Sequence, residues 1–558
     1  MRYFFHKMPM GVRAQYIAPL LIVLFLTVIS PTSTQTDPIQ VRIDQMTLQQ
    51  KIGQMFMVHT YGAGVSFAGR EMLQTWQPAG VVLFDNNIST PAGTTRVVNE
   101  YQQTMADVGA IPLFIATDQE GGWIMRMREG FTELPPIALV TATDNPDLQY
   151  RMGQAMATEI RAVGVNMNLA PVADLDTNRA NTVIGRRSPG FIPDLVGRML
   201  SHYIDGMQSA GVLATVKHFP GHGDTREDSH LTLPKITHNR DFLLSREIIP
   251  FQYAIRADVA AVMVAHIWFT AFDETETPAT LSYNVVTGLL RQELGYNGII
   301  MTDAMDMDAI EARYTPDEAA IRAILAGIDL VVYGTGFSER LQMVAMQGVL
   351  NAVNNGRIDE ARIDESVYRI LSAKADYGLF DWQPLDSNGA NVRIQSANTP
   401  ELLSQVFDAG VTVAYDNYQH LPITDEDRVA IIYPGQRTLI LRACGNYHPS
   451  IQWLPISNAP TRDEIELAVG LSMRVDKVVV FTRNAIEITA QARLINALPP
   501  EKTIAVALYS PYDVTLFPQV GGYAVTYGPQ DDGVWSACRI LLGVSPALGT
   551  LAVNLSSP

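Results

Sequence analysis

From about residue 40 to residue 380, short runs of apolar and β-branched residues alternate with segments of helical periodicity. This alternation is typical of parallel strands joined by helical crossovers. The predicted strands are Gln54–Val58, Gly80–Phe84, Pro112–Asp118, Asn166–Pro171, Leu213–Phe219, Ala260–Ile267, Gly298–Asp303 and Asp329–Gly334. Eight such units predict an α/β fold, a (β/α)₈ TIM barrel. An open doubly wound sheet is the alternative, but the glycine-rich nucleotide loop typical of that fold is missing.

A closing helical stretch is predicted from Glu360 to Leu379, after which the pattern changes. Residues 381–400 are polar and irregular, which indicates a linker between a barrel domain at 37–380 and a second domain at 401–558. The second domain alternates again and predicts a smaller three-layer α/β/α sandwich. Its predicted strands are Val429–Tyr433, Lys477–Thr482, Thr503–Tyr509 and Tyr523–Tyr527.

Residues 1–36 have the layout of a secretory signal peptide. Basic residues precede an apolar run at 17–29, and a polar stretch follows it. The run is shorter than the roughly 20 residues of a membrane-spanning helix, yet an uncleaved N-terminal membrane anchor remains an alternative. We therefore expect an extracellular or cell-envelope protein. Cys444 and Cys538 are either two buried thiols or a disulfide, and their spacing does not decide between them.

Charge narrows the choice of partners. The chain has 57 acidic and 40 basic residues, a formal net charge of −17. Nucleic-acid binding requires basic surfaces that neutralise phosphates, so we expect no nucleic-acid partner.

Ionisable residues gather where five consecutive predicted strands end. The third strand runs into Asp118–Gly122, the fifth into the segment 217–230, and the seventh ends at Asp303. The loop after the fourth strand contains Gly185–Ser188, and the sixth strand carries His266. A single such aspartate usually caps a helix. Five in succession favour an active site, because the loops at the carboxyl ends of barrel strands converge.

The segment 217–230 holds three of the ten histidines. Asp228 lies two residues before His230, close enough to orient and charge the imidazole, which would make it a proton donor near neutral pH. A metal site is the alternative, with ligands from His218, His222, Asp224, Asp228 and His230. The neighbouring cations Lys217 and Arg226 would repel a metal ion, so we expect neither a metal nor a cofactor.

The stretch KHFPGHGDTREDSHLTLP (217–234) resembles the signature of the β-N-acetylglucosaminidase (β-hexosaminidase) branch of glycoside hydrolase family 3. The resemblance extends over about residues 40–558. It includes DQEGG (118–122), IGRRS (184–188), VMVAHI (262–267), GIIMTDAMDM (298–307) and ALYSPYDV (507–514).

The resemblance implies a retaining glycosidase that releases terminal non-reducing β-linked N-acetylglucosamine from peptidoglycan or chitin-type oligosaccharides. It implies that Asp303 is the nucleophile and that His230 is the acid/base, partnered by Asp228. The residues implied to bind sugar hydroxyls are Asp118, Arg126, Arg187, Lys217 and His218. One position departs from the family pattern: relatives often have arginine after the double glycine, where this chain has Trp123. Its ring could stack on a leaving-group sugar or pack in the core.

Other functions fit parts of the same pattern. The same fold could act as a β-N-acetylglucosaminide phosphorylase or a β-glucosidase, and a metal-dependent hydrolase would be sensitive to chelators. A non-catalytic sugar-binding wall protein is a candidate of another class. The intact Asp228, His230 and Asp303 argue against it.

Overall fold

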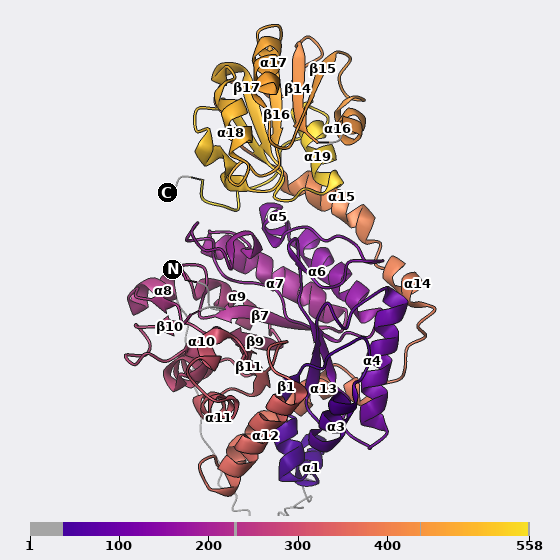
Figure 1. The fold of residues 1–558 in the computed structure, drawn as a ribbon, viewed down its shortest axis with the longest axis vertical. Coiled ribbons are helices and arrows are strands. Elements are labelled where there is room, and N and C mark those ends of the chain that lie inside the picture. Colours follow the sequence, from indigo (N-terminus) through magenta and orange to yellow (C-terminus); the bar gives the residue numbers. More distant parts are fainter. Residues whose placement is uncertain (1–36, 228–231, 436, 556–558) are drawn as a thin grey trace, which may run out of the picture.

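The computed structural model describes residues 37–227, 232–435 and 437–555. The segment 1–36, predicted to be a signal peptide or an anchor, therefore lies outside the described residues, as do Asp228 and His230. The first domain is a closed barrel of parallel strands with surrounding helices, as the sequence predicts (Figure 1). Its strands are β1 (Phe56–Val58), β2 (Gly80–Leu83), β3 (Phe114–Thr117), β6 (Met167–Asn168), β7 (Leu213–Phe219), β9 (Ala261–Val264), β11 (Ile299–Ala304) and β12 (Leu330–Val332). Around the barrel the order is β1-β12-β11-β9-β7-β6-β3-β2.

Helices follow or precede each barrel strand. They are α1 (Pro38–Asp44), α2 (Leu48–Gly53), α3 (Phe67–Trp76), α4 (Pro91–Ala106), α5 (Ile137–Ala142), α6 (Pro146–Arg161), α7 (Pro193–Ser209), α8 (Arg240–Ser245), α9 (Ile249–Arg256), α10 (Asp308–Glu311), α11 (Pro316–Ala326), α12 (Glu339–Asn354) and α13 (Glu360–Asp376), with a π-helix at Asn284–Glu293. Several begin at a proline, whose fixed φ suits the first helical turn. For α4 and α6, Thr90 and Asn145 also cap the exposed backbone N–H groups.

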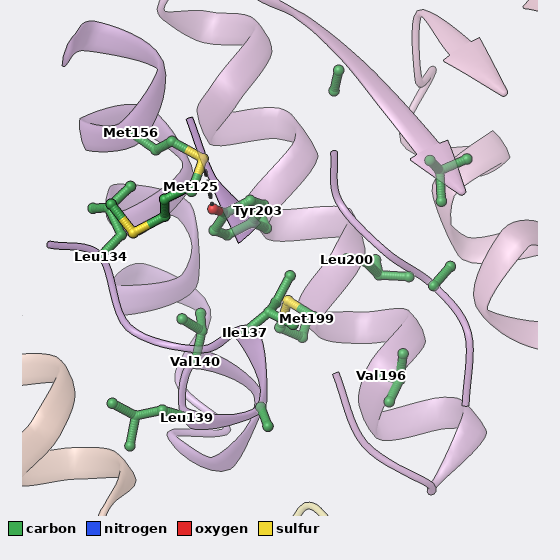
Figure 2. Close-up of a cluster of buried hydrophobic side chains, with 14 of the residues drawn as sticks. Met125, Leu134, Ile137, Leu139, Val140, Met156, Val196, Met199, Leu200 and Tyr203 are labelled. Atoms are coloured by element: carbon green, nitrogen blue, oxygen red, sulfur yellow. Dashed lines mark hydrogen bonds between the residues drawn. The ribbon is translucent and has the colours of Figure 1, made fainter. Parts of the chain in front are cut away.

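The barrel strands are short and apolar because both of their faces are buried. Inward-facing side chains such as Met57, Phe114 and Met301 fill the barrel interior. A separate cluster packs between α5, α6 and α7 (Figure 2), where the hydroxyl of Tyr203 donates to the sulfur of Met156 at 3.2 Å. This cluster includes Met125 of the short hairpin β4 (Gln119–Gly121) and β5 (Ile124–Met125), so it anchors the hairpin that follows β3.

The second domain is a single sheet flanked by helices, which confirms the predicted α/β architecture. Its strands are β13 (Thr412–Asp416), β14 (Val429–Pro434), β15 (Ile451–Ile456), β16 (Lys477–Thr482), β17 (Thr503–Ala507) and β18 (Gly522–Val525), in the order β13-β18-β17-β16-β14-β15. All neighbours are parallel except β13, which runs antiparallel to β18. The edge strands β13 and β15 were absent from the sequence prediction. The helices are α15 (Thr399–Gly410), α16 (Arg437–Cys444), α17 (Arg462–Ser472), α18 (Thr489–Asn496) and α19 (Asp531–Leu541).

Two details correct or complete the sequence analysis. The stretch 381–400, predicted to be irregular, contains the short helix α14 (Ala390–Gln395). Cys444 and Cys538 form a disulfide that joins α16 to α19 across 94 residues of sequence. Disulfides persist mainly in oxidising compartments, so this bond is compatible with the export that the N-terminal segment predicts. Among the described residues, no helix combines the length and apolar character needed to cross a membrane.

The two domains are fastened together by helix packing and by a chain segment after α19. Helix α15 contacts both α5 and α6 of the barrel domain. The segment at 550–554 then returns to the barrel, where the N–H of Thr550 donates to the carbonyl of Ala142 at 2.8 Å. The carbonyl of Ala552 accepts from the N–H of Phe191 at 2.9 Å. The second domain is thereby held over the loops after β3 and β6.

Candidate active site

A cavity of about 610 Å³ lies at the carboxyl ends of the barrel strands. Six of the residues singled out from the sequence line it together: Asp118, Arg126, Arg187, Lys217, His218 and Asp303. The barrel brings them together, because they lie at the carboxyl ends of β7 and β11 or in the loops that follow β3 and β6 at the same end. The candidate acid/base His230 and its partner Asp228 are outside the described residues.

Asp303 lies in β11, and its carboxylate accepts the backbone N–H of Ala304 at 2.8 Å. Burial by itself would raise the pKa of this carboxyl group. The neighbouring imidazoles of His218 and His266, the Ala304 N–H and the Lys217 ammonium outweigh burial and lower the pKa to about 2. Asp303 is therefore ionised at neutral pH, which a carboxylate nucleophile requires.

A buried network of charges forms one wall of the cavity. The ammonium of Lys217 lies 2.7 Å from Asp118 Oδ1 and 2.7 Å from Glu120 Oε1. Arg187 binds the carboxylate of Glu120 through two hydrogen bonds, at 2.8 and 2.9 Å. Burial opposes ionisation of Glu120, but Arg187 and Lys217 hold its pKa well below the usual range. Glu120 thus fixes both cations in place, a role missed in the sequence although DQEGG was noted.

His218 is oriented by a carboxylate that the sequence analysis also missed. Its Nδ1 lies 2.7 Å from Oδ2 of Asp174, which is fully buried. Because an ionised carboxylate only accepts, Nδ1 carries the hydrogen and Nε2 is left for a ligand in the cavity. Asp174 also accepts the backbone N–H of His222 at 2.7 Å. One carboxylate therefore positions the start of the segment 217–230.

Two further histidines are buried near Asp303; the sequence analysis considered His222 only as a metal ligand and His266 only as an ionisable residue of the sixth strand. His266 Nε2 lies 3.0 Å from the carbonyl oxygen of Ala304, so the ring supports the backbone next to Asp303. His222 lines the cavity, and burial lowers its pKa to about 4 although the nearby Asp174 opposes that change. His222 is therefore neutral at physiological pH.

Arg126, the residue after the hairpin β4–β5, lines the cavity, whereas Trp123 in the turn of that hairpin lies outside its lining. The guanidinium of Arg126 lies 3.4 Å from Asp85 and 3.9 Å from Asp118, and its buried Nε has no hydrogen-bond partner among the described residues. The ring of Trp123 is 51% exposed, so it does not pack in the core.

The charge network gives a stability prediction. Lys217→Met should lower the free energy of unfolding by about 3–5 kcal/mol, because Asp118 and Glu120 would be left close together without the cation between them. The matched control is Lys235→Met, an exposed lysine whose amine lies over the Trp268 ring, with an expected loss of at most about 1 kcal/mol. Denaturant unfolding of both variants measures the difference. Equal losses would mean that the Lys217 network does not stabilise the fold.

Comparison with known proteins places this site in a family. The family model described as "Glycosyl hydrolase family 3 N terminal domain" matches residues 47–373. The chain is 26% identical to Beta-hexosaminidase A of Pseudoalteromonas piscicida over 546 residues, which cover 87% of this chain and 90% of that protein. It is 35% identical to a Beta-hexosaminidase of Tolumonas auensis over 279 residues, covering 50% of this chain and 81% of the relative.

A solved structure agrees with both. A glycoside hydrolase family 3 beta-N-acetylglucosaminidase from Paenibacillus sp. str. FPU-7 superimposes with a TM-score of 0.78 at 34% identity, covering 92% of this chain and all of that one. The family model spans more than half of the chain. The cavity at the carboxyl ends of the barrel strands contains the ionised carboxylate of Asp303. The chain belongs to glycosyl hydrolase family 3.

Proposed function

We propose that the protein is a retaining β-N-acetylhexosaminidase, a glycosidase that releases terminal β-linked N-acetylglucosamine from the non-reducing end of oligosaccharides. The observation that carries the proposal is the ionised Asp303, half-buried at the end of β11, in a cavity shared with Arg187, Lys217 and His218. These residues supply a nucleophile and hydrogen-bond donors for sugar hydroxyls. The relatives named as hexosaminidases support the choice of substrate.

The reaction proceeds in two displacements. The carboxylate of Asp303 attacks the anomeric carbon while the bond to the leaving oxygen breaks and His230 gives that oxygen a proton. Water then attacks the glycosyl-enzyme, His230 takes the proton from the water, and Asp303 leaves as a carboxylate. Two inversions retain the β configuration. The His218 and His266 imidazoles, the Ala304 N–H and Lys217 together keep Asp303 ionised between turnovers.

Nitrophenyl glycosides test the substrate. We expect kcat/KM for the β-N-acetylglucosaminide to be at least about 100-fold higher than for the matched β-glucoside. The glucoside lacks the 2-acetamido group, so the protein groups that bind this amide would be left without hydrogen-bond partners. The first product should be the β-anomer of N-acetylglucosamine by NMR. Equal rates would indicate a β-glucosidase, an α-anomer would exclude a nucleophilic Asp303, and a sugar 1-phosphate formed in phosphate buffer would indicate a phosphorylase.

A further inference from the structure

A second cavity, of about 550 Å³, lies between the two domains. We call it the interdomain cavity. The barrel contributes Trp123, Arg179 and Arg186 to its lining, and the second domain contributes Asn484, Glu487 and Tyr509. Four residues line both this cavity and the active-site cavity: Ile124, Thr182, Val183 and Arg187. The two cavities are therefore immediate neighbours, and the part of a substrate beyond its terminal sugar would lie on the side of the interdomain cavity.

Aromatic rings from both domains form one wall. Trp123 and Tyr509 have ring centroids 6.0 Å apart at an interplanar angle of 43°. The guanidinium of Arg186 lies 4.8 Å from the Trp123 ring centroid. A half-exposed tryptophan inside a concave site is a surface for the apolar face of a ligand, and pyranose rings present such a face.

A polar side chain in the same cavity has no protein partner. Asn484 follows β16 with a φ of +138°, a conformation that is strained for a residue other than glycine. It is only 6% exposed, and its Oδ1 has no hydrogen-bond partner among the described residues. Buried acceptors are normally satisfied, so the strained backbone holds an acceptor in position for a donor such as a sugar hydroxyl.

The charges of the wall favour an uncharged ligand. Arg186 is paired with Glu487 across the domain boundary at 2.9 Å, and Arg187 is held by Glu120. Arg179 has the Asp176 carboxyl group of the same cavity as its electrostatic partner, stacks on the Tyr512 ring and donates to the carbonyl of Asn554 at 2.9 Å. The Glu487 side chain is 68% exposed, so its effect is one of selectivity: a carboxylate on the ligand would compete with Glu487 for Arg186 and would be repelled by that glutamate.

We propose that the interdomain cavity binds the leaving-group sugar and that Glu487, by neutralising Arg186, restricts this sugar to an uncharged one. The proposal rests on the proposed function and makes it more specific: neutral oligosaccharides of β-linked N-acetylglucosamine are preferred over saccharides whose next sugar bears a carboxylate. The second domain supplies the selectivity through Glu487, Asn484 and Tyr509, while the barrel carries the chemistry.

Three substrates test the proposal: the β-fluoride of N-acetylglucosamine, its neutral β-1,4 disaccharide, and the matched disaccharide whose reducing sugar carries a 3-O-lactyl carboxylate. Fluoride is too small to occupy the interdomain cavity. We expect Trp123→Ala and Tyr509→Ala to lower kcat/KM on the neutral disaccharide about 10-fold or more, and on the fluoride less than about 3-fold, because only remote binding is lost. Tyr418→Ala, an exposed tyrosine of the second domain outside the cavity, is the control.

The charge comparison uses Glu487→Gln. The wild type should prefer the neutral disaccharide over the anionic one by about 10-fold, and Glu487→Gln should shrink or reverse this ratio by freeing Arg186 for the carboxylate. A wild type that prefers the anionic disaccharide, or a ratio unchanged in Glu487→Gln, would overturn the selectivity. Equal effects of Trp123→Ala on fluoride and disaccharide would overturn the binding site. Failure to cleave even the fluoride would instead refute the proposed function.

Discussion

Asp303→Asn should lower kcat on the order of 10⁴-fold or more while the protein stays folded. A neutral amide cannot form the covalent glycosyl-enzyme, and removal of a catalytic nucleophile commonly has an effect of this size. The native carboxylate has a pKa of about 2, so its ionised form is present throughout the pH range in which the enzyme could work. The loss should consequently be the same at pH 5 and pH 8.

The measurement is turnover of the nitrophenyl β-N-acetylglucosaminide, with thermal unfolding as the check on folding. Asp376→Asn, an exposed aspartate near the end of α13, is the matched control and should keep full activity. A 2-fluoro sugar that traps the glycosyl-enzyme should label Asp303 in the wild type. Residual activity above about 1%, or a label on another residue, would contradict the assignment.

His230→Ala should separate good from poor leaving groups. A departing sugar alkoxide needs a proton, whereas nitrophenolate scarcely does. General acid catalysis contributes about 10²–10⁴-fold, so the variant should lose that much on the β-1,4 disaccharide and far less on the nitrophenyl substrate. Asp228→Ala should give a milder version of the same pattern, because Asp228 orients and charges the imidazole.

The two substitutions act through one group, so the effect of the double variant should be less than additive. His202→Ala in α7, outside the cavity, is the control and should leave both substrates unaffected. If His230→Ala slows both substrates alike, the histidine serves only to close the segment over the ligand, and another residue must donate the proton.

The sequence was sufficient to predict the barrel but not every strand of the second domain. Barrel strands such as β2 and β9 are buried along their whole length, so they appear as unbroken apolar runs. The missed strands β13 and β15 lie at the edges of their sheet and are largely half-buried. Edge strands tolerate polar residues and proline, as at Pro455, which removes the apolar signal.

The residues of the candidate site likewise fall into a group that the sequence predicted and a group that it did not. Residues at strand ends were predicted because position in the chain fixes their place on the barrel. Glu120 and Asp174 act through partners that are 67 and 44 residues away in sequence, Arg187 and His218. Such pairs depend on how neighbouring strands are aligned. A single sequence indicates which residues are ionisable near the site, but not which carboxylate orients which cation.

The segment at 550–554 limits how the protein can be shortened. Cutting the chain between 381 and 400 to obtain a minimal barrel would remove the acceptor of the Phe191 N–H and the donor to the Ala142 carbonyl. It would also uncover α5, whose fully buried Leu139 lies against Gly410 of α15. A truncated barrel would thus expose the apolar surface of α5 to solvent and would be prone to aggregate. Engineering a compact enzyme from this chain requires new polar residues on α5 as well as the deletion.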